Sequence, residues 1–444
     1  MGLAVLPVEI YHREFDAKLW LAVQLAQVNR HIVLLGYDKH LTPLLPHLPS
    51  CCILDKSCST LMWRSRILPV ISNGGKALIS DEEGFNNLET LPSIYLTRID
   101  AEALQSISNY YCWGIIDQSF YSQIPGFSEK STISGNMRSD LLSQLGHQYY
   151  SEHVSALESL YGDFVLCSDN FAVEHRQGDN YVIPKFNVSS SQNETNSRLF
   201  DESVLHASNR RDVYAAILHS LLKKFPTTQF VLRPHPISDP RWWLDQFWKY
   251  RNFHLSYHHS IEPWLHACKA MISFGCTTSV QAIIANKPVI EISPPDVDDV
   301  KKYGKARGFS HLFTPYNVSN SVEASDALSS ILQNINPNYL PQKNLDDYWF
   351  TSPNQSRVSY FSDEVNSALC SLGAFSIPQL SHIFNNYLNQ KIPQKIPFNS
   401  DKWLLPSRSI ILKKFKIFSS ILGVSQPKIA FLSNGLFVIS PSPD

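Results

Sequence analysis

The stretch Phe230-Val231-Leu232-Arg233-Pro234-His235-Pro236 indicates both a fold class and a place for chemistry. Its apolar half is typical of a buried strand, and the two prolines end that strand because each fixes φ and lacks an amide donor. Arg233 and His235 are thereby held at the carboxyl edge of a predicted sheet, where open α/β sheets bind ligands. Arginine offers a fork of donors to phosphate, and histidine adds a directional donor. The turn is either a phosphate-binding corner or an ordinary loop.

Short apolar runs alternate with helical patterns on both sides of this turn, which predicts parallel sheets with crossover helices. The helical patterns include residues 15–27 and 212–225. The strands are expected at residues 3–8, 32–35, 76–80, 94–96, 132–133, 164–167, 229–232, 253–256, 270–274 and 288–292. Two α/β domains of similar size, over 1–155 and 156–335, fit this series better than the alternative, a single large doubly wound sheet.

The bulk composition excludes several classes of protein. A chain of 444 residues with 43% hydrophobic and 17% charged residues is long enough for two or three globular domains. A formal charge of -1 argues against a whole-surface nucleic-acid binder. The eight cysteines lack metal-site spacing and are expected to be buried, reduced thiols. We expect neither a signal peptide nor a membrane span, and predict a cytoplasmic protein.

A second candidate for anion binding follows the predicted strand 270–274. The order strand, glycine turn, hydroxyl-rich segment and helix would present backbone amides and hydroxyl groups to a phosphate. The alternative is plain helix capping, which needs only one serine or threonine. The candidate nucleotide-binding residues are Arg233, His235, Pro236, Ser273, Gly275, Thr277, Thr278 and Ser279.

Three acids and a glycine, Asp81-Glu82-Glu83-Gly84, leave the predicted strand 76–80 of the first domain. Crowded carboxylates disfavour full ionisation, so one of them is expected to have a raised pKa. Such a group suits a general base, or a nucleophile at a sugar carbon, and the catalytic candidates are Glu82 and Glu83. The alternative is a solvated acidic turn.

Other polar side chains gather near predicted strand ends. They either line an acceptor or sugar-binding site, or serve as caps and turns, with the acids after the first strand favouring a helix dipole. The candidates are Glu9, Arg13, Glu14, Asn136, Arg138 and Asn170. Trp242, Trp243, Trp248 and Trp264 are interpreted as packing residues of the second domain.

Residues 336–444 are predicted to be a C-terminal extension. Within it, 407–422 form a basic amphipathic segment with Lys413, Lys414 and Lys416 among apolar residues. Such a segment either lies on an anionic membrane surface or packs as a helix on the second domain.

Several motifs together resemble bacterial surface carbohydrate biosynthesis proteins, in order from about residue 5 to 295. They are Pro7-Val8-Glu9-Ile10, Arg13-Glu14-Phe15-Asp16, Asp81-Glu82-Glu83-Gly84, Ser134-Gly135-Asn136-Met137-Arg138-Ser139-Asp140-Leu141-Leu142, Tyr161-Gly162-Asp163-Phe164, Arg233-Pro234-His235-Pro236 and Cys276-Thr277-Thr278. The layout is similar to that of GT-B glycosyltransferases that use CMP-activated Kdo or sialic acid. This resemblance implies two Rossmann-like domains facing a cleft.

The resemblance also implies an activity: metal-independent transfer of an acidic sugar from CMP to a bacterial surface glycan or lipid-linked acceptor, with no cofactor. Glu82-Glu83-Gly84 matches the catalytic motif, and His235-Pro236 with Thr277-Thr278 matches the CMP-holding motifs. The implied location is the cytoplasm, at the inner face of the cytoplasmic membrane if 407–422 binds lipid.

Two departures from the family pattern keep other activities open. Glu83 stands where related Kdo transferases tend to have Asp, and Gln281 where many relatives carry a glutamate. The alternatives are a CDP-polyol phosphotransferase, a non-catalytic glycan-assembly scaffold and a nucleotide-sugar epimerase of GT-B shape.

Overall fold

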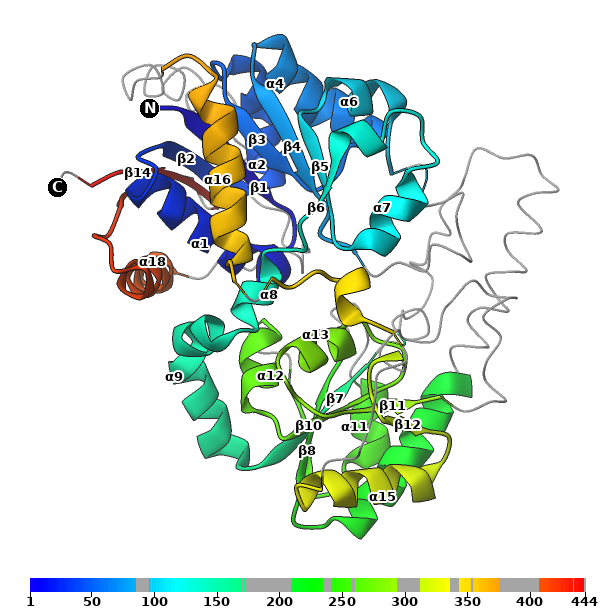
Figure 1. Ribbon diagram of the computed structural model, residues 1–444. Helices are drawn as coiled ribbons and strands as arrows, with labels where there is room; N and C mark the ends of the chain where they lie inside the picture. Colours follow the sequence, from blue (N-terminus) through cyan, green and yellow to red (C-terminus); the bar gives the residue numbers. More distant parts are fainter. Residues whose placement is uncertain are drawn as a thin grey trace. The chain divides into compact units, whose positions relative to one another are not determined.

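The computed structural model describes residues 1–84, 96, 98–169, 171, 209–234, 241–256, 260–293, 312–335, 343–352, 354–374, 407–433 and 435–442. The chain forms two compact units, each built on a sheet that is wholly or mainly parallel, as the sequence predicts. Unit 1 contains residues 1–149 and 345–444, and unit 2 contains residues 150–344 (Figure 1). The predicted boundary near 155 is therefore close to the observed one, but 345–444 is part of the first unit and not a separate extension.

Unit 1 has an eight-stranded sheet in the order β13-β14-β2-β1-β3-β4-β5-β6. Its strands are β1 (Leu3–Val8), β2 (Ile32–Tyr37), β3 (Cys52–Asp55), β4 (Lys76–Ser80), β5 (Asn109–Cys112), β6 (Ser131–Ile133), β13 (Lys428–Ser433) and β14 (Leu436–Ser440). Its helices are α1 (Tyr11–Gln27), α2 (Asp38–Leu41), α3 (Thr60–Met62), α4 (Leu68–Ser72), α6 (Ala101–Ser106), α7 (Ile115–Tyr121), α8 (Arg138–Leu141), α16 (Arg357–Cys370) and α18 (Arg408–Leu422), with short turns η1 (Thr42–His47), η2 (Trp63–Ile67), η3 (Ser128–Lys130) and η7 (Leu345–Asp347).

Unit 2 has a six-stranded sheet in the order β12-β11-β10-β7-β8-β9, in which every neighbouring pair is parallel. Its strands are β7 (Phe164–Ser168), β8 (Gln229–Arg233), β9 (Phe253–Leu255), β10 (Ala270–Ser273), β11 (Val289–Ile292) and β12 (Tyr316–Val318). Its helices are α11 (Arg241–Phe247), α12 (Glu262–Ala267), α13 (Thr278–Ile284) and α15 (Ser321–Leu332), a further helix described over 209–224, and most of α9 (Gln144–Tyr161), which begins in unit 1.

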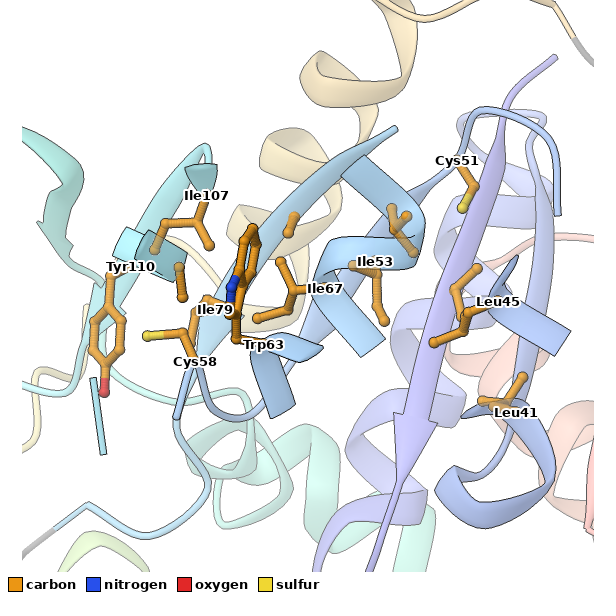
Figure 2. Close-up of a cluster of buried hydrophobic side chains, with 14 of the residues drawn as sticks. Leu41, Leu45, Cys51, Ile53, Cys58, Trp63, Ile67, Ile79, Ile107 and Tyr110 are labelled. Atoms are coloured by element: carbon orange, nitrogen blue, oxygen red, sulfur yellow. The ribbon is translucent and has the colours of Figure 1, made fainter. Parts of the chain in front are cut away.

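The central strands are continuous apolar runs because parallel strands are covered on both faces. Every residue of β1 and β2 is buried. One face of the unit 1 sheet packs on a cluster that includes Ile53, Trp63, Ile67 and Ile79 (Figure 2). All eight cysteines are free thiols, and all except Cys276 and Cys370 are buried, as predicted.

The C-terminal hairpin explains why residue 36 is glycine. The sequence predicts that Gly36 ends the second strand, but β2 continues to Tyr37, and β14 pairs with it antiparallel, Leu436 opposite Gly36. A Cβ atom at Gly36 would lie 2.4 Å from the carbonyl oxygen of Gly435. The glycine therefore marks a close approach of two backbones, and not the end of a strand.

Helix α18 packs on unit 1, which corrects the prediction that segment 407–422 packs on the second domain. Its apolar residues Phe415 and Phe418 are fully buried. The Phe418 ring stacks on Trp20 of α1, with centroids 5.2 Å apart, and on Tyr149, 4.0 Å away. The face with Ile411, Phe415 and Phe418, which would have entered a membrane, is thus occupied by protein, while Ile410 and Leu412 stay exposed. None of the helices among the described residues has the length and apolarity needed to cross a bilayer.

Candidate active site

The acid loop, residues 81–84, leaves the carboxyl end of β4 in the interior of the unit 1 sheet, between β3 and β5. This is the edge where ligands bind in open α/β sheets. The three carboxylates are consecutive in sequence, but the structure gives each a different environment. Those environments determine which of the acids can meet a substrate.

Glu82 is locked in the interior, with only 2% of its side chain exposed. Its carboxylate lies 3.7 Å from Nζ of Lys18 and 3.4 Å from Nε of Arg138. The Asn136 side-chain amide also donates to it at 3.4 Å, and Arg138 donates to the Glu82 carbonyl oxygen at 3.0 Å. A buried carboxylate between two cations is held in a single position. Glu82 therefore fixes the course of the loop.

Asp81 anchors the beginning of the loop. Its carboxylate accepts bonds from Arg98 and from the Glu83 amide, both at 2.8 Å. Its carbonyl oxygen accepts from the Trp113 indole at 2.6 Å and from Asn136 at 3.1 Å. Burial raises the pKa of Asp81, and Arg98 acts in the opposite direction. Asp81 is thus an acid of this loop with a raised pKa, and burial is the main cause of the shift, whereas crowding of the carboxylates was the predicted cause.

Glu83 is the acid that reaches solvent, with 48% of its side chain exposed. Arg13 donates to one carboxylate oxygen at 3.2 Å, and Arg98 lies 3.6 Å from the other. Burial acts to raise the pKa of Glu83, but Arg13 and Arg98, followed by Lys56, outweigh it, so the pKa is lowered. Glu83 is therefore an ionised, accessible carboxylate at neutral pH.

Gly84 lets the loop pass an aromatic ring. A Cβ atom at this position would lie 2.1 Å from Cδ2 of Trp113. Trp113 in turn packs on Trp349, with ring centroids 4.3 Å apart, and the Arg138 guanidinium lies 5.3 Å from the Trp113 ring. The glycine of the motif is thus required because the backbone contacts a ring that is itself held by a cation and a second tryptophan.

Glu14 and Arg13 come from the first turn of α1, beside the acid loop. The Glu14 side chain is fully buried and accepts from the amides of Glu9 at 2.9 Å and Ile10 at 3.4 Å. Burial acts to raise the pKa of Glu14, but the nearby cations Lys18 and Arg13 outweigh burial and lower this pKa to about 2. These contacts favour the capping interpretation for Glu14. Arg13 and Glu9 stay partly exposed, and Glu9 pairs with Lys56.

The predicted residues Asn136, in the turn after β6, and Arg138, the first residue of α8, are both buried and hold the acid loop. Asp140 of the same motif accepts from the amides of Arg357 and Val358 and from the Ser356 hydroxyl, so it caps α16. The motif 134–142 therefore joins the acid loop to the C-terminal part of unit 1.

Unit 2 presents a smaller polar set at its own carboxyl edge. Arg233, the last residue of β8, lies 5.0 Å over the Trp264 ring. Burial lowers the pKa of Arg233 to about 10, with Glu262 acting to raise it, so the guanidinium is charged at neutral pH. The predicted partners His235 and Pro236, like Asn170, lie outside the described residues.

The hydroxyl-rich segment divides into internal and outward groups. Ser273 accepts from the Cys276 amide at 3.3 Å, and Ser279 donates to the Cys276 carbonyl at 2.5 Å, and both serines are fully buried. Gly275 has φ +74° and gives its amide to Glu291 at 2.6 Å. Thr277 is exposed and Thr278 half-buried. These two threonines remain as the hydroxyl groups that can reach a ligand.

Several residues of the two edges were not identified from the sequence. Arg98, Lys56 and Trp113 lie around the acid loop, but no motif in the sequence next to them predicts a role in the site. Glu291 could have been found, because a charged residue inside the apolar run Val289–Ile292 indicates a specific partner. Within the described part of the chain, no cluster of three His, Cys, Asp or Glu side chains could hold a metal ion.

Comparison with known proteins adds information about the fold. No protein-family model matches the sequence, and no curated protein matches it significantly. UDP-GlcNAc 2-epimerase from Methanocaldococcus jannaschii superposes with a TM-score of 0.51 at 10% identity, covering 83% of this chain and 100% of the epimerase. A variant of the wall teichoic acid polymerase TagF with CDPG superposes with a TM-score of 0.50 at 12% identity, covering 83% of this chain and 89% of TagF. At these identities the likeness concerns the fold alone, and the fold of this chain is the α/β architecture of GT-B type.

Proposed function

We propose that this protein is a glycosyltransferase that moves an acidic sugar, of the Kdo or sialic-acid type, from a CMP-activated donor to a bacterial surface glycan or lipid-linked acceptor. The observation that carries the proposal is the environment of Glu83, an accessible carboxylate held between two arginines at the carboxyl edge of β4. The fold supports it, because the same architecture occurs in a UDP-GlcNAc 2-epimerase and in TagF, which was studied with CDPG.

Glu83 is the reacting acid in this proposal, and Glu82 is a positioning residue. In the reaction the bond from the anomeric carbon to the CMP phosphate oxygen breaks, CMP leaves with the electron pair, and the acceptor oxygen forms the new bond. As a general base, Glu83 takes the acceptor proton and the configuration inverts. As a nucleophile, it forms a glycosyl-enzyme that the acceptor then displaces, and the configuration is retained. Its lowered pKa keeps it ionised for either role.

Arg13 and Arg98 are the groups that would meet the carboxylate of an acidic sugar. Their side chains keep 23% and 22% exposure while they contact Glu83. An arginine fork pairs with a carboxylate in two parallel hydrogen bonds. A carboxylate on the donor would give these two partly exposed guanidinium groups a further partner beside Glu83, which supports the acidic class of sugar.

The nucleotide is assigned to the carboxyl edge of unit 2. Arg233, Thr277 and Thr278 would contact the phosphate, while Ser273, Gly275 and Ser279 shape the turn that carries the threonines. His235 and Pro236 join this set on the family resemblance. Cationic and hydroxyl donors stabilise the departing CMP without a metal ion in this scheme.

A CDP-polyol phosphotransferase is the second candidate, and the shared fold with TagF supports it. Both reactions release CMP, so a cytidine preference alone does not separate them. Transfer of radiolabel from a CMP-sugar, compared with a CDP-polyol, identifies the donor. An epimerase would convert a UDP-sugar with no acceptor, and a scaffold would turn over none of these donors.

Two measurements test the proposal. Calorimetry with CMP, CDP, UDP and GDP should show preference for a cytidine nucleotide, and silence with all four would favour the scaffold. Glu83→Gln should lower donor turnover by about 10²–10⁴-fold and leave thermal stability nearly unchanged, because Glu83 is half exposed. Glu102→Gln, at an exposed acid of α6, is the matched control. Near-normal turnover by the Glu83→Gln enzyme would remove the assignment of this residue.

A further inference from the structure

Among the residues that the structure describes, the most exposed tryptophan lies in unit 2, away from its carboxyl edge. Trp248, which the sequence interpretation assigned to packing, is 81% exposed, whereas Trp243 and Trp264 are buried as predicted. The Trp248 amide bonds to the Leu244 carbonyl at 2.9 Å, so the helical turn of α11 extends to this residue. Leu244, four residues earlier, lies on the same side of that turn and is 47% exposed. The two side chains form an exposed apolar pair.

Three cations accompany this pair. Lys249 and Arg251 lie within three residues after Trp248, and Lys223 lies in the last turn of the helix before β8; all three are exposed. His219, four residues before Lys223 on one helix, contacts the Tyr250 hydroxyl at 3.1 Å. This contact joins the helix that carries Lys223 to the segment that carries Lys249 and Arg251. Burial lowers the pKa of His219, and Lys249 and Lys223 act in the same direction.

The charges around the pair are mainly uncompensated. Among the described residues, no carboxylate lies within ion-pair distance of Lys223, Lys249 or Arg251. The adjacent Lys224 is 3.6 Å from Asp326, and Asp245 is the one acid on α11 itself. The surface thus combines apolar side chains with a net positive charge.

The topology places this surface at the amino edge of the unit 2 sheet. Lys223 precedes β8, and residues 248–251 precede β9, which pairs with β8 in parallel. Arg233 ends β8 and Thr277 follows β10, both at the opposite edge. A contact made by the amino edge therefore leaves the proposed nucleotide site open.

We propose that Leu244, Trp248, Lys223, Lys249 and Arg251, the amino-edge patch, bind the surface of an anionic lipid bilayer. Tryptophan is enriched at the depth of lipid headgroups, and lysine and arginine are attracted by anionic lipids. Two apolar side chains are too few for a stable protein interface, which buries about 800 Å² on each partner. The inference stands independently of the proposed enzymatic activity.

Helix α18 is the competing membrane contact, and it provides the control. It also carries exposed cations, Lys413 and Lys416, but its aromatic residues Phe415 and Phe418 are buried against unit 1. It therefore lacks the exposed aromatic anchor that α11 has. Lys413→Gln/Lys416→Gln removes the same charge as Lys249→Gln/Arg251→Gln from a surface that we do not expect to bind.

Vesicle flotation of the full chain tests the proposal. The protein should float with vesicles of phosphatidylcholine and phosphatidylglycerol, stay unbound with phosphatidylcholine alone, and bind less at high salt. Lys249→Gln/Arg251→Gln should reduce binding by about fivefold per cation removed, and Trp248→Ser should also reduce it, while the α18 variant should bind like wild type. Each variant should keep the wild-type melting temperature because the substituted side chains are exposed.

Three results would overturn the proposal. The first is absence of flotation with anionic vesicles. The second is wild-type binding by Lys249→Gln/Arg251→Gln and by Trp248→Ser, together with loss of binding by Lys413→Gln/Lys416→Gln. This result would assign the membrane contact to α18. The third is a concentration-dependent dimer that Trp248→Ser dissociates, without vesicle binding, which would make the patch an interface between two copies.

Discussion

Replacing Lys18 by methionine tests the core of the candidate site. The Lys18 ammonium donates to the Pro7 carbonyl at 2.6 Å and to Glu14 at 3.3 Å, and lies 3.7 Å from Glu82. Only 3% of its side chain is exposed. Methionine fills similar space but leaves two buried carboxylates with one cation fewer. Breaking a buried ion pair in this way costs about 3–5 kcal/mol, which corresponds to a fall of roughly 6–20 °C in the melting temperature of a unit of this size.

The effect should depend on pH through Glu14. Its folded pKa of about 2 lies below the unfolded value of 4.5, so its carboxylate contributes stability above pH 4.5, and this contribution is lost as pH falls toward 2. The difference between the two pKa values corresponds to about 3 kcal/mol. Without Lys18 the pKa of Glu14 rises. The loss in free energy of unfolding caused by Lys18→Met should therefore be largest at neutral pH. It should shrink below pH 4.5, where Glu14 of the unfolded chain becomes protonated and the stabilisation by its carboxylate is lost in the wild type as well.

Urea unfolding, followed by tryptophan fluorescence at several pH values, measures this deficit. Lys39→Met, at an exposed lysine of α2, should change the free energy of unfolding by less than about 0.5 kcal/mol. The double variant Lys18→Met/Glu14→Gln should lose less than the sum of its single variants, because removing both partners leaves no unpaired charge. A loss below about 1 kcal/mol for Lys18→Met, or the same loss at pH 3 as at pH 7, would refute this account.

Two further predictions concern residues that support the site. Gly84→Ala would place a methyl group 2.1 Å from the Trp113 ring, so it should lower donor turnover and shift the near-ultraviolet circular dichroism of the indoles; an unchanged spectrum with wild-type turnover would contradict the tight passage. Phe418→Ala removes a fully buried ring that stacks on Trp20 and Tyr149, and should cost about 3–5 kcal/mol and expose α18 to proteolysis; resistance equal to wild type would show that α18 is held by other contacts.

Local sequence patterns identified much of the fold. The strands β1, β4, β8 and β11 lie where apolar runs predict them, because a strand covered on both faces must be apolar along its length. The C-terminal hairpin was missed because its partner is at the other end of the chain: β14 pairs with β2 through Leu436 and Gly36. Likewise, the sequence predicts a helix over 15–27, but not that α1 is buried almost throughout, because α16 and α18, which flank it, come from the other end of the chain (Figure 1).

The roles of individual site residues were less accessible from sequence. Consecutive acids in the sequence carry no information about which one is buried, and Glu82 and Glu83 differ through cations from α1, α8 and the segment before α6. The sequence of the hydroxyl-rich segment likewise does not show which hydroxyl groups are accessible. Ser273 and Ser279 form hydrogen bonds within the segment, whereas Thr277 is exposed. His235, Pro236 and Asn170 stay predictions, as does the CMP-sugar specificity.

Strand and helix periodicity and proline and glycine stops are local properties, so the two α/β units with polar groups after their strands could be predicted from the sequence. Which of these polar groups are structural, and which can meet a ligand, depends on contacts made in the folded protein. Glu82 is buried between Lys18 and Arg138, whereas Glu83 pairs with Arg13 and Arg98 and stays exposed to solvent. The physical reason is that burial and pairing set the charge and reach of a carboxylate, and both come from residues distant in the chain.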